Sequence, residues 1–166
     1  LTPQETGALV EIGDFAFQSA SQTLQTLLDK ETEIKETKVE VLSGEGLKAK
    51  FVAPVVSLEI ECKKGLKGNI MLFLQVPDAV AISGLMLKQE IVADKDELND
   101  MEFSSVSETL NQVVNTLIIS FGKFIKREVE TGLPTVKLLH MAEEEQPDFP
   151  AEKKVVQTTH RFIIKN

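Results

Sequence analysis

Two long segments with the apolar spacing of an amphipathic helix constrain the fold of this chain more than any other feature. They cover residues 5–30 and 104–128, and in both of them apolar residues recur at steps of three and four. When the first segment is shifted by 97 residues it aligns with the second, and Glu11 then corresponds to Glu108. Each segment is followed by a short polar break, a strand pattern, a loop and a long strand pattern. Because order and spacing are both repeated, we predict an internal duplication.

The rest of the sequence shows the patterns of strands and short connections. A short apolar helix is predicted over residues 77–87, and the acidic, polar residues 94–102 are interpreted as the connector between the two halves. Alternating and apolar runs predict strands over residues 37–42, 51–61, 66–76, 135–141 and 154–164.

These elements predict an α/β (α+β) fold. We expect a helix-β-β-β-helix unit repeated about a pseudo-two-fold axis, with the long helices packed on a shared sheet. A chain of 166 residues can bury one sizeable core, so a single domain with halves of about 1–93 and 94–166 is expected. The second half lacks counterparts of residues 66–87, and the first residue is Leu1. We therefore expect this sequence to be a fragment of a longer chain.

Composition argues against several classes of function. With 18 Lys and Arg against 26 Asp and Glu, the net charge of −8 disfavours a nucleic-acid partner. No apolar run approaches the ~20 residues that span a bilayer, so direct membrane insertion is not expected. Cys62 is the only cysteine and the two histidines, His140 and His160, are far apart, which disfavours a metal site. We expect no metal and no cofactor bound by the chain itself.

One pattern on the second helical segment could carry chemistry, namely Glu108-x-x-Asn111. Residues three apart lie on one helical face, so this carboxylate and this amide project into one neighbourhood. A carboxylate can pair with a lysine of a partner, and an amide can both accept and donate hydrogen bonds to water. Phosphoryl transfer depends on such positioning. The alternative is structural, because Ser105 and Glu108 also match a helix capping box.

Two segments resemble signatures of the CheC, CheX and FliY family of phosphatases. The segment Val10-Glu11-Ile12-Gly13-Asp14 is similar to a Glu-Ile-Gly-Asn-type segment of the family. Ser104, Glu108 and Asn111 match the second signature, in which an Asp or Ser precedes the Glu by four residues and the Asn follows by three. Residues 105–112 are most similar to the FliY branch, in its middle domain. The duplicated layout also matches, so the resemblance covers nearly the whole chain and implies a CheC-like fold.

The resemblance implies hydrolysis of the aspartyl phosphate of the chemotaxis response regulator CheY-P. It implies that Glu108 pairs with a lysine of the regulator and that Asn111 orients the attacking water, with Ser104 at the leading, binding position. The Mg²⁺ of the reaction would belong to the regulator. Flagellar switch proteins of the FliM, FliN and FliG type are the other implied partners, at the cytoplasmic face of the flagellar basal body.

The first half departs from this pattern. Asp14 stands where the family has Asn, and Gly7 occupies the leading position. An ionised Asp donates no hydrogen bond and repels a phosphoryl group, by about 1 kcal/mol at ~4 Å in water and about 4 kcal/mol near a protein surface. We therefore predict a main site at Glu108 and Asn111 and a degraded site at Glu11 and Asp14, where Asp14→Asn should restore activity.

Two other interpretations remain. The chain could be a non-catalytic rotor scaffold of the flagellar switch, resembling the FliM middle domain, which shares the fold but lacks the Glu and Asn pairs. It could also be a stand-alone CheC with the same chemistry. The pair Glu108 and Asn111 separates the enzyme from the scaffold and favours the enzyme.

Overall fold

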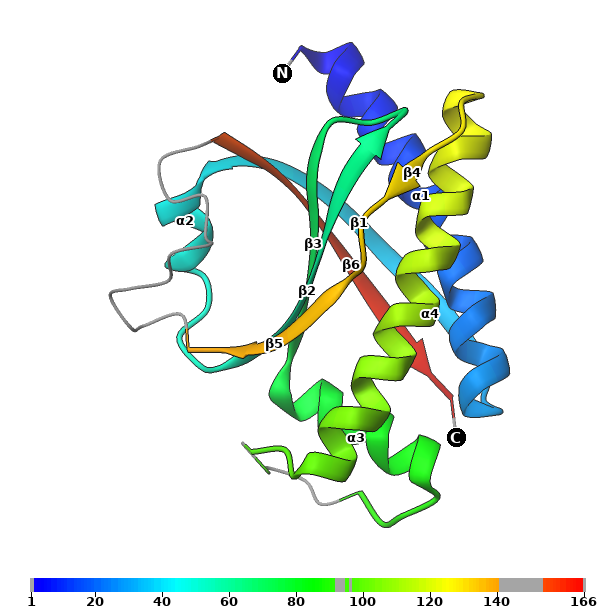
Figure 1. Cartoon of the computed structure of the whole chain (residues 1–166), viewed down its shortest axis with the longest axis vertical. Coiled ribbons are helices and arrows are strands. Elements are labelled where there is room, and N and C mark those ends of the chain that lie inside the picture. Colours follow the sequence, from blue (N-terminus) through cyan, green and yellow to red (C-terminus); the bar gives the residue numbers. More distant parts are fainter. Residues whose placement is uncertain (1, 92–94, 96, 141–153, 166) are drawn as a thin grey trace.

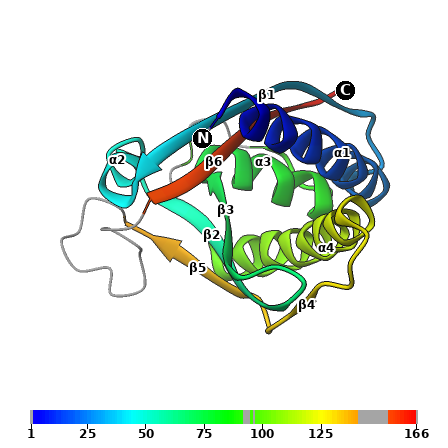
Figure 2. The ribbon, with the colours of Figure 1, turned by 90° about the horizontal axis from the view of Figure 1, so that it is seen from above.

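The long helices of this protein lie together on one side of the strands (Figure 1). The computed structural model describes residues 2–91, 95, 97–140 and 154–165. Two long helices, α1 (Pro3–Leu28) and α4 (Asp100–Ile125), lie side by side and run in opposite directions, and α3 (Val76–Leu87) packs at one end of the pair (Figures 1 and 2). Within the described residues, no helix is long and apolar enough to cross a bilayer. The predicted α/β (α+β) class is confirmed.

The strands form two antiparallel sets. The long strands β1 (Thr32–Ser43) and β6 (Lys154–Ile164) pair with each other, and the short helix α2 (Gly44–Lys48) follows β1. The second set is centred on β2 (Val55–Lys64), which pairs with β3 (Gly68–Gln75), β4 (Glu130–Thr131) and β5 (Thr135–Leu139). Hydrogen bonding thus divides the described strands into two sheets, where the sequence predicted one shared sheet.

Each half pairs its first strand with the long strand of the other half. In β1 and β6, Leu42 lies opposite Val155, and in β5 and β2, Leu139 lies opposite Val55. Corresponding residues are 97 positions apart in the first strands, β1 and β5, and 100 positions apart in the long strands, β2 and β6. The same offsets relate the pair Ile34 and Phe162 to the pair Thr131 and Cys62. The halves therefore interlock, because neither long strand pairs with the first strand of its own half.

Two of the clusters of buried apolar side chains hold the long helices and α3 on the strands. One lies between α4 and β2, and the other lies where α1, α3 and α4 meet. Both contain side chains of α4, which places this helix at the centre of the core. The first cluster comprises Val56, Leu58, Ile60, Ala79, Val106, Leu110, Val114 and Ile118, and the second comprises Ala16, Ala20, Leu24, Leu28, Ile82, Val113 and Leu117.

The main correction to the predicted elements concerns the start of α4. This helix begins at Asp100, because Asn99 caps it and forms a capping box with Glu102. The connector is therefore shorter than residues 94–102, and residues 105–108 lie inside the helix. α4 ends at Ile125 because Lys126 adopts a left-handed conformation, with φ of 53°.

The first half differs from prediction in its details. α1 begins at Pro3, two residues before the predicted helix over residues 5–30, behind a capping box formed by Thr2 and Glu5. β1 begins five residues before the predicted strand over 37–42, and a register shift between Ile34 and Thr37 interrupts its alternation. The helix α2 was not predicted.

The packing of α4 makes a direct prediction about stability. Leu117 is 1% exposed and contacts the second cluster, whereas Ile119 on the same helix is 59% exposed. Leu117→Ala should lower the free energy of unfolding by about 2–5 kcal/mol, because it removes buried methyl groups and leaves a cavity. The matched variant Ile119→Ala should change it by less than about 0.5 kcal/mol. Denaturant unfolding measures both, and equal losses would contradict this packing.

Candidate functional site

The predicted main site lies in the middle of α4. Glu108 and Asn111 are about one turn apart on this helix, and Glu108 is exposed. Because the capping box of α4 is formed by Asn99 and Glu102, the interpretation of Glu108 as a capping residue is wrong. One carboxylate oxygen of Glu108, Oε1, accepts a hydrogen bond of 2.9 Å from Nε2 of Gln112.

Asn111 presents an unpaired acceptor. Its side-chain oxygen Oδ1 is buried, and no described residue donates a hydrogen bond to it. A buried polar atom without a partner costs about 1–3 kcal/mol, and folded proteins keep few of them. This oxygen has no existing hydrogen bond to lose, and because it is buried the amide must turn outward before a bound molecule can reach it. Ser104, the predicted binding residue, is exposed one turn before Glu108.

The predicted degraded site has a different arrangement, because the Asp14 carboxylate already accepts a hydrogen bond. The hydroxyl of Thr37 on β1 donates a hydrogen bond to the Asp14 carboxylate on α1. Oγ1 of the same threonine lies 3.1 Å from Nδ1 of His160 on β6. A hydroxyl has one hydrogen, so His160 donates through Nδ1 to Thr37, which donates to Asp14. Sequence reasoning missed Thr37 and His160 in this role.

The ring of His160 is packed tightly against α1. It stacks on Phe17 with ring centroids 3.6 Å apart, and a Cβ atom on Gly13 would lie only 3.2 Å from its Cε1. Its second nitrogen, Nε2, is buried and accepts no hydrogen bond from the described residues. Burial lowers the pKa of His160 to about 4, against the smaller opposing effect of the Asp14 carboxylate. The imidazole is therefore neutral at pH 7.

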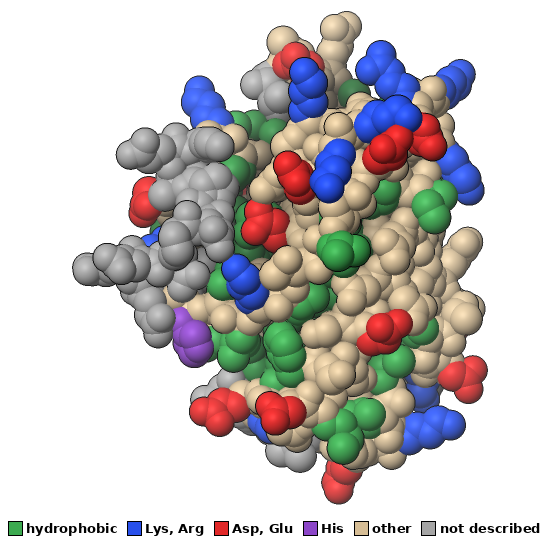
Figure 3. Space-filling model, viewed as in Figure 1, with side chains coloured by type: hydrophobic (Ala, Val, Ile, Leu, Met, Phe, Trp, Pro, Cys, Tyr) green, Lys and Arg blue, Asp and Glu red, His purple; other side chains and the backbone are tan. Residues whose placement is uncertain are grey.

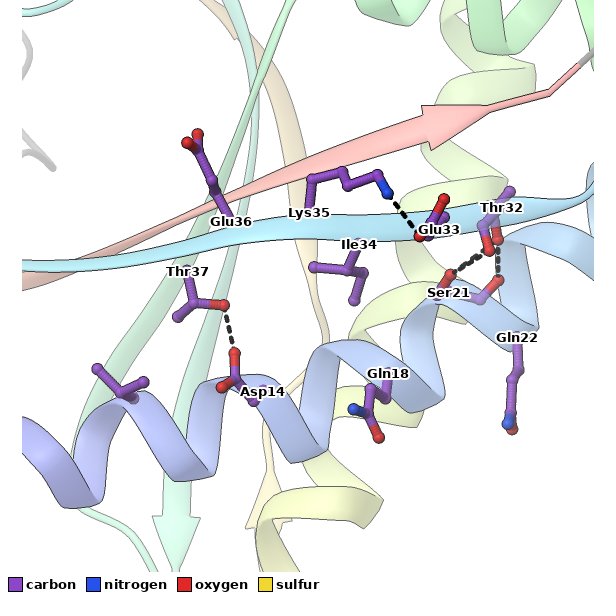
Figure 4. Close-up of a pocket in the computed structure, with 11 residues that line it drawn as sticks. Asp14, Gln18, Ser21, Gln22, Thr32, Glu33, Ile34, Lys35, Glu36 and Thr37 are labelled. Carbon is purple, nitrogen blue, oxygen red and sulfur yellow. Dashed lines mark hydrogen bonds and ion pairs between the residues drawn. The ribbon is translucent and has the colours of Figure 1, made fainter.

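A groove of about 600 Å³ separates α1 from β1 on this side (Figure 4). Asp14 and Thr37 bridge helix and strand towards one end, and Ser21 and Thr32 bridge them towards the other, with their hydroxyl oxygens 2.8 Å apart. Glu11 is exposed and does not line the groove, so the first half does not bring the predicted pair into it together.

The strand register explains why the two halves differ. Under the offsets of 97 and 100 residues, Thr37 corresponds to Pro134 and His160 corresponds to Ile60. Proline has no N–H group, and the isoleucine side chain has no polar atom. Neither Pro134 nor the side chain of Ile60 can therefore donate a hydrogen bond to Asn111. The acceptor on α1 is therefore paired, and its counterpart on α4 is not.

Metal ligands do not converge in the described part of the chain. Residues 2–91, 95, 97–140 and 154–165 contain no group of three or more His, Cys, Asp or Glu side chains placed to hold a metal ion. The face with α4 and β4 carries acidic and basic side chains side by side, without a continuous basic patch (Figure 3).

The buried imidazole predicts a pH dependence of stability. The unfolded chain binds a proton at His160 near pH 6.5, whereas the folded chain binds it only near pH 4. Stability should therefore fall as the pH is lowered from 6.5 to 4, because the unfolded state takes up the proton first. In His160→Phe this fall should be shallower. Thermal unfolding between pH 7 and 4.5 measures it, with His140→Phe as the exposed control. Equal pH profiles in all three proteins would contradict the role of His160.

Comparison with known proteins gives sequence relatives but no matching protein-family model. The flagellar motor switch phosphatase FliY of Bacillus subtilis (strain 168) is 27% identical over 165 residues, which are 99% of this chain and 44% of that protein. The chain therefore spans less than half the length of this curated relative.

Solved structures share the fold. The X-ray structure of Thermotoga maritima FliY matches with a TM-score of 0.88 and 26% identity, over 99% of this chain and 85% of that chain. The FliM middle domain from H. pylori matches with a TM-score of 0.78 and 16% identity, over 99% and 87% of the two chains. CheX from Vibrio vulnificus matches with a TM-score of 0.60 and 16% identity, over 91% of each.

The matches to FliM and CheX show the fold alone, whereas the matches to FliY extend to the sequence. The resemblance to the CheC, CheX and FliY family, predicted from two short signatures together with the duplicated layout, is therefore confirmed: in sequence and in fold, this chain is similar to FliY along almost its whole length.

Proposed function

We propose that this chain is a phosphatase module of a flagellar motor switch protein and that it hydrolyses the aspartyl phosphate of CheY-P. The observation that carries the proposal is the pair on α4. An exposed carboxylate on Glu108 stands about one turn from Asn111, whose amide oxygen is buried and accepts no hydrogen bond from the described residues. The similarity to the B. subtilis protein, whose name is flagellar motor switch phosphatase, supports the same assignment.

In the proposed reaction the two side chains act by positioning. Glu108 pairs with a lysine of the regulator, which anchors the phosphorylated partner against α4. The Asn111 amide, turned outward so that Oδ1 becomes accessible, holds a water molecule in line with the phosphorus, since Oδ1 accepts from the water and Nδ2 can donate. The water oxygen forms the new bond to phosphorus as the bond to the aspartyl oxygen breaks, which releases inorganic phosphate and regenerates the aspartate. The Mg²⁺ that neutralises the phosphoryl charge is bound by the regulator.

The wider setting of the protein is part of the proposal. We place the chain as a single domain, with halves of about 1–93 and 94–166, within a longer switch protein. It would act at the cytoplasmic face of the flagellar basal body, beside switch proteins of the FliM, FliN and FliG type. A structure of a FliG–FliM complex from H. pylori matches this fold with a TM-score of 0.80 at 16% identity, which agrees with such a setting.

A non-catalytic switch scaffold is the second candidate, favoured by the fold shared with the FliM middle domain. A scaffold would bind its neighbours through the surface of the helices and strands, and the side-chain oxygen of Asn111 would have no functional role. The two candidates therefore differ in what a change at position 111 does.

The decay of phosphorylated CheY in the presence of this chain tests the proposal. We expect the parent protein to accelerate the decay and Asn111→Ala to abolish the acceleration. The isosteric Asn111→Asp reproduces the residue of the first half, and its added charge should lower the rate by one to a few factors of ten. Absence of acceleration by the parent, with binding of CheY-P confirmed separately, would favour the scaffold.

The degraded site can be examined alone in an Asn111→Ala background. Asp14→Asn removes the repelling charge, but the Thr37 hydroxyl can still donate to the new amide oxygen and keep it engaged. We therefore expect a small gain from Asp14→Asn and a gain of at least about tenfold when Thr37→Val is added, since valine keeps the shape and lacks the hydroxyl. Equal activities of the single and combined variants would show that Thr37 does not silence this site.

A further inference from the structure

Gln112 is the one described side chain that holds the Glu108 carboxylate by a hydrogen bond. It follows Glu108 by one turn of α4, is half-buried, and donates from Nε2 to Oε1 over 2.9 Å. The contact engages one oxygen of the carboxylate and leaves Oε2 for a second partner. Because glutamine is neutral, it orients the carboxylate without cancelling the negative charge that a partner's lysine would meet.

The first half has no such support. The residue that corresponds to Gln112 there is Phe15, whose ring is 42% exposed and contacts Phe124 with centroids 5.8 Å apart. A phenyl ring donates no hydrogen bond to a carboxylate, so Phe15 cannot hold Glu11 in the way that Gln112 holds Glu108. The hydrogen bond from Gln112 to Glu108 therefore occurs in the same half as the Asn111 oxygen that has no described donor.

We propose that Gln112 is a positioning residue for the phosphatase reaction. It fixes the rotamer of Glu108 so that the free carboxylate oxygen faces the lysine of the phosphorylated regulator. This inference rests on the proposed function, because it assigns Gln112 to the same pairing step. An exposed glutamate is otherwise free to sample many rotamers, and ordering it before the partner arrives lowers the cost of forming the pair.

The position of Gln112 also determines which kinetic quantity depends on it. The amide touches neither the phosphoryl group nor the water in the proposed reaction and acts only through Glu108. Its loss should therefore weaken the pairing with the regulator and leave the water held by Asn111 in place. The expected signature is a change in KM with little change in kcat.

Steady-state dephosphorylation of CheY-P by variants at position 112 tests this. Gln112→Met keeps the length of the side chain and removes the donor, and should raise KM about three- to tenfold with kcat within about twofold of the parent. Gln112→Lys should raise KM further, because an ammonium group one turn from Glu108 forms an ion pair that competes with the regulator's lysine.

The matched control is Gln25→Met, which makes the same change at an exposed position of α1 and should leave both constants unchanged. Thermal unfolding of each variant separates a loss of folding from a loss of positioning. An active parent and an inactive Asn111→Ala variant would support the proposed function. If Gln112→Met then has the same KM as the parent, the inference about Gln112 is overturned while the proposed function stands. If the parent itself does not accelerate the decay, both are overturned.

Discussion

The antiparallel contact between α1 and α4 is the constraint on which the rest of the structure depends. Ala16 and Ala20 are fully buried, so α1 can approach α4 closely. The hydroxyl oxygens of Thr23 and Thr116 lie 2.9 Å apart across this contact. Because the helices run in opposite directions, their N-terminal halves lie at opposite ends of the pair (Figure 1). The two candidate sites are therefore separated along the helix pair.

The strand residues that correspond to each other in the two halves differ in their capacity to donate hydrogen bonds. On one side, Thr37 and His160 supply donors, and the acid of α1 is bound into a chain of hydrogen bonds. On the other side, the equivalent positions hold Pro134 and Ile60, and the amide oxygen of α4 has no described donor. The helices alone would suggest two similar sites. The difference arises from residues outside the helices, and the contact of His160 with Thr37 spans 123 residues of the sequence.

The difference between local and long-range contacts also explains which features could be predicted from the sequence. Helical periodicity is a local signal, so it predicted both long helices and placed Glu108 and Asn111 on one face. The start of α4 was missed because Asn99 and Glu102 lie in a polar stretch that resembles a loop, while Ser105 and Glu108 match the same capping pattern. The contact of His160 with Thr37 spans 123 residues and depends on the register of β1 and β6, which local patterns do not specify.

Hydrogen bonding at the two candidate sites affects the stability of the fold in opposite ways. Pairing of the Asp14 carboxylate joins α1 to two strands and stabilises the fold, as does the stacking of His160 on Phe17. The unpaired oxygen of Asn111 costs about 1–3 kcal/mol, and a donor at the position of Pro134 or Ile60 would offset it. Such a donor would also occupy the acceptor that a water molecule needs. Under the proposed function, a half that gains this hydrogen bond becomes more stable and loses the acceptor that the reaction needs, so stability and catalysis make opposite demands on the same position.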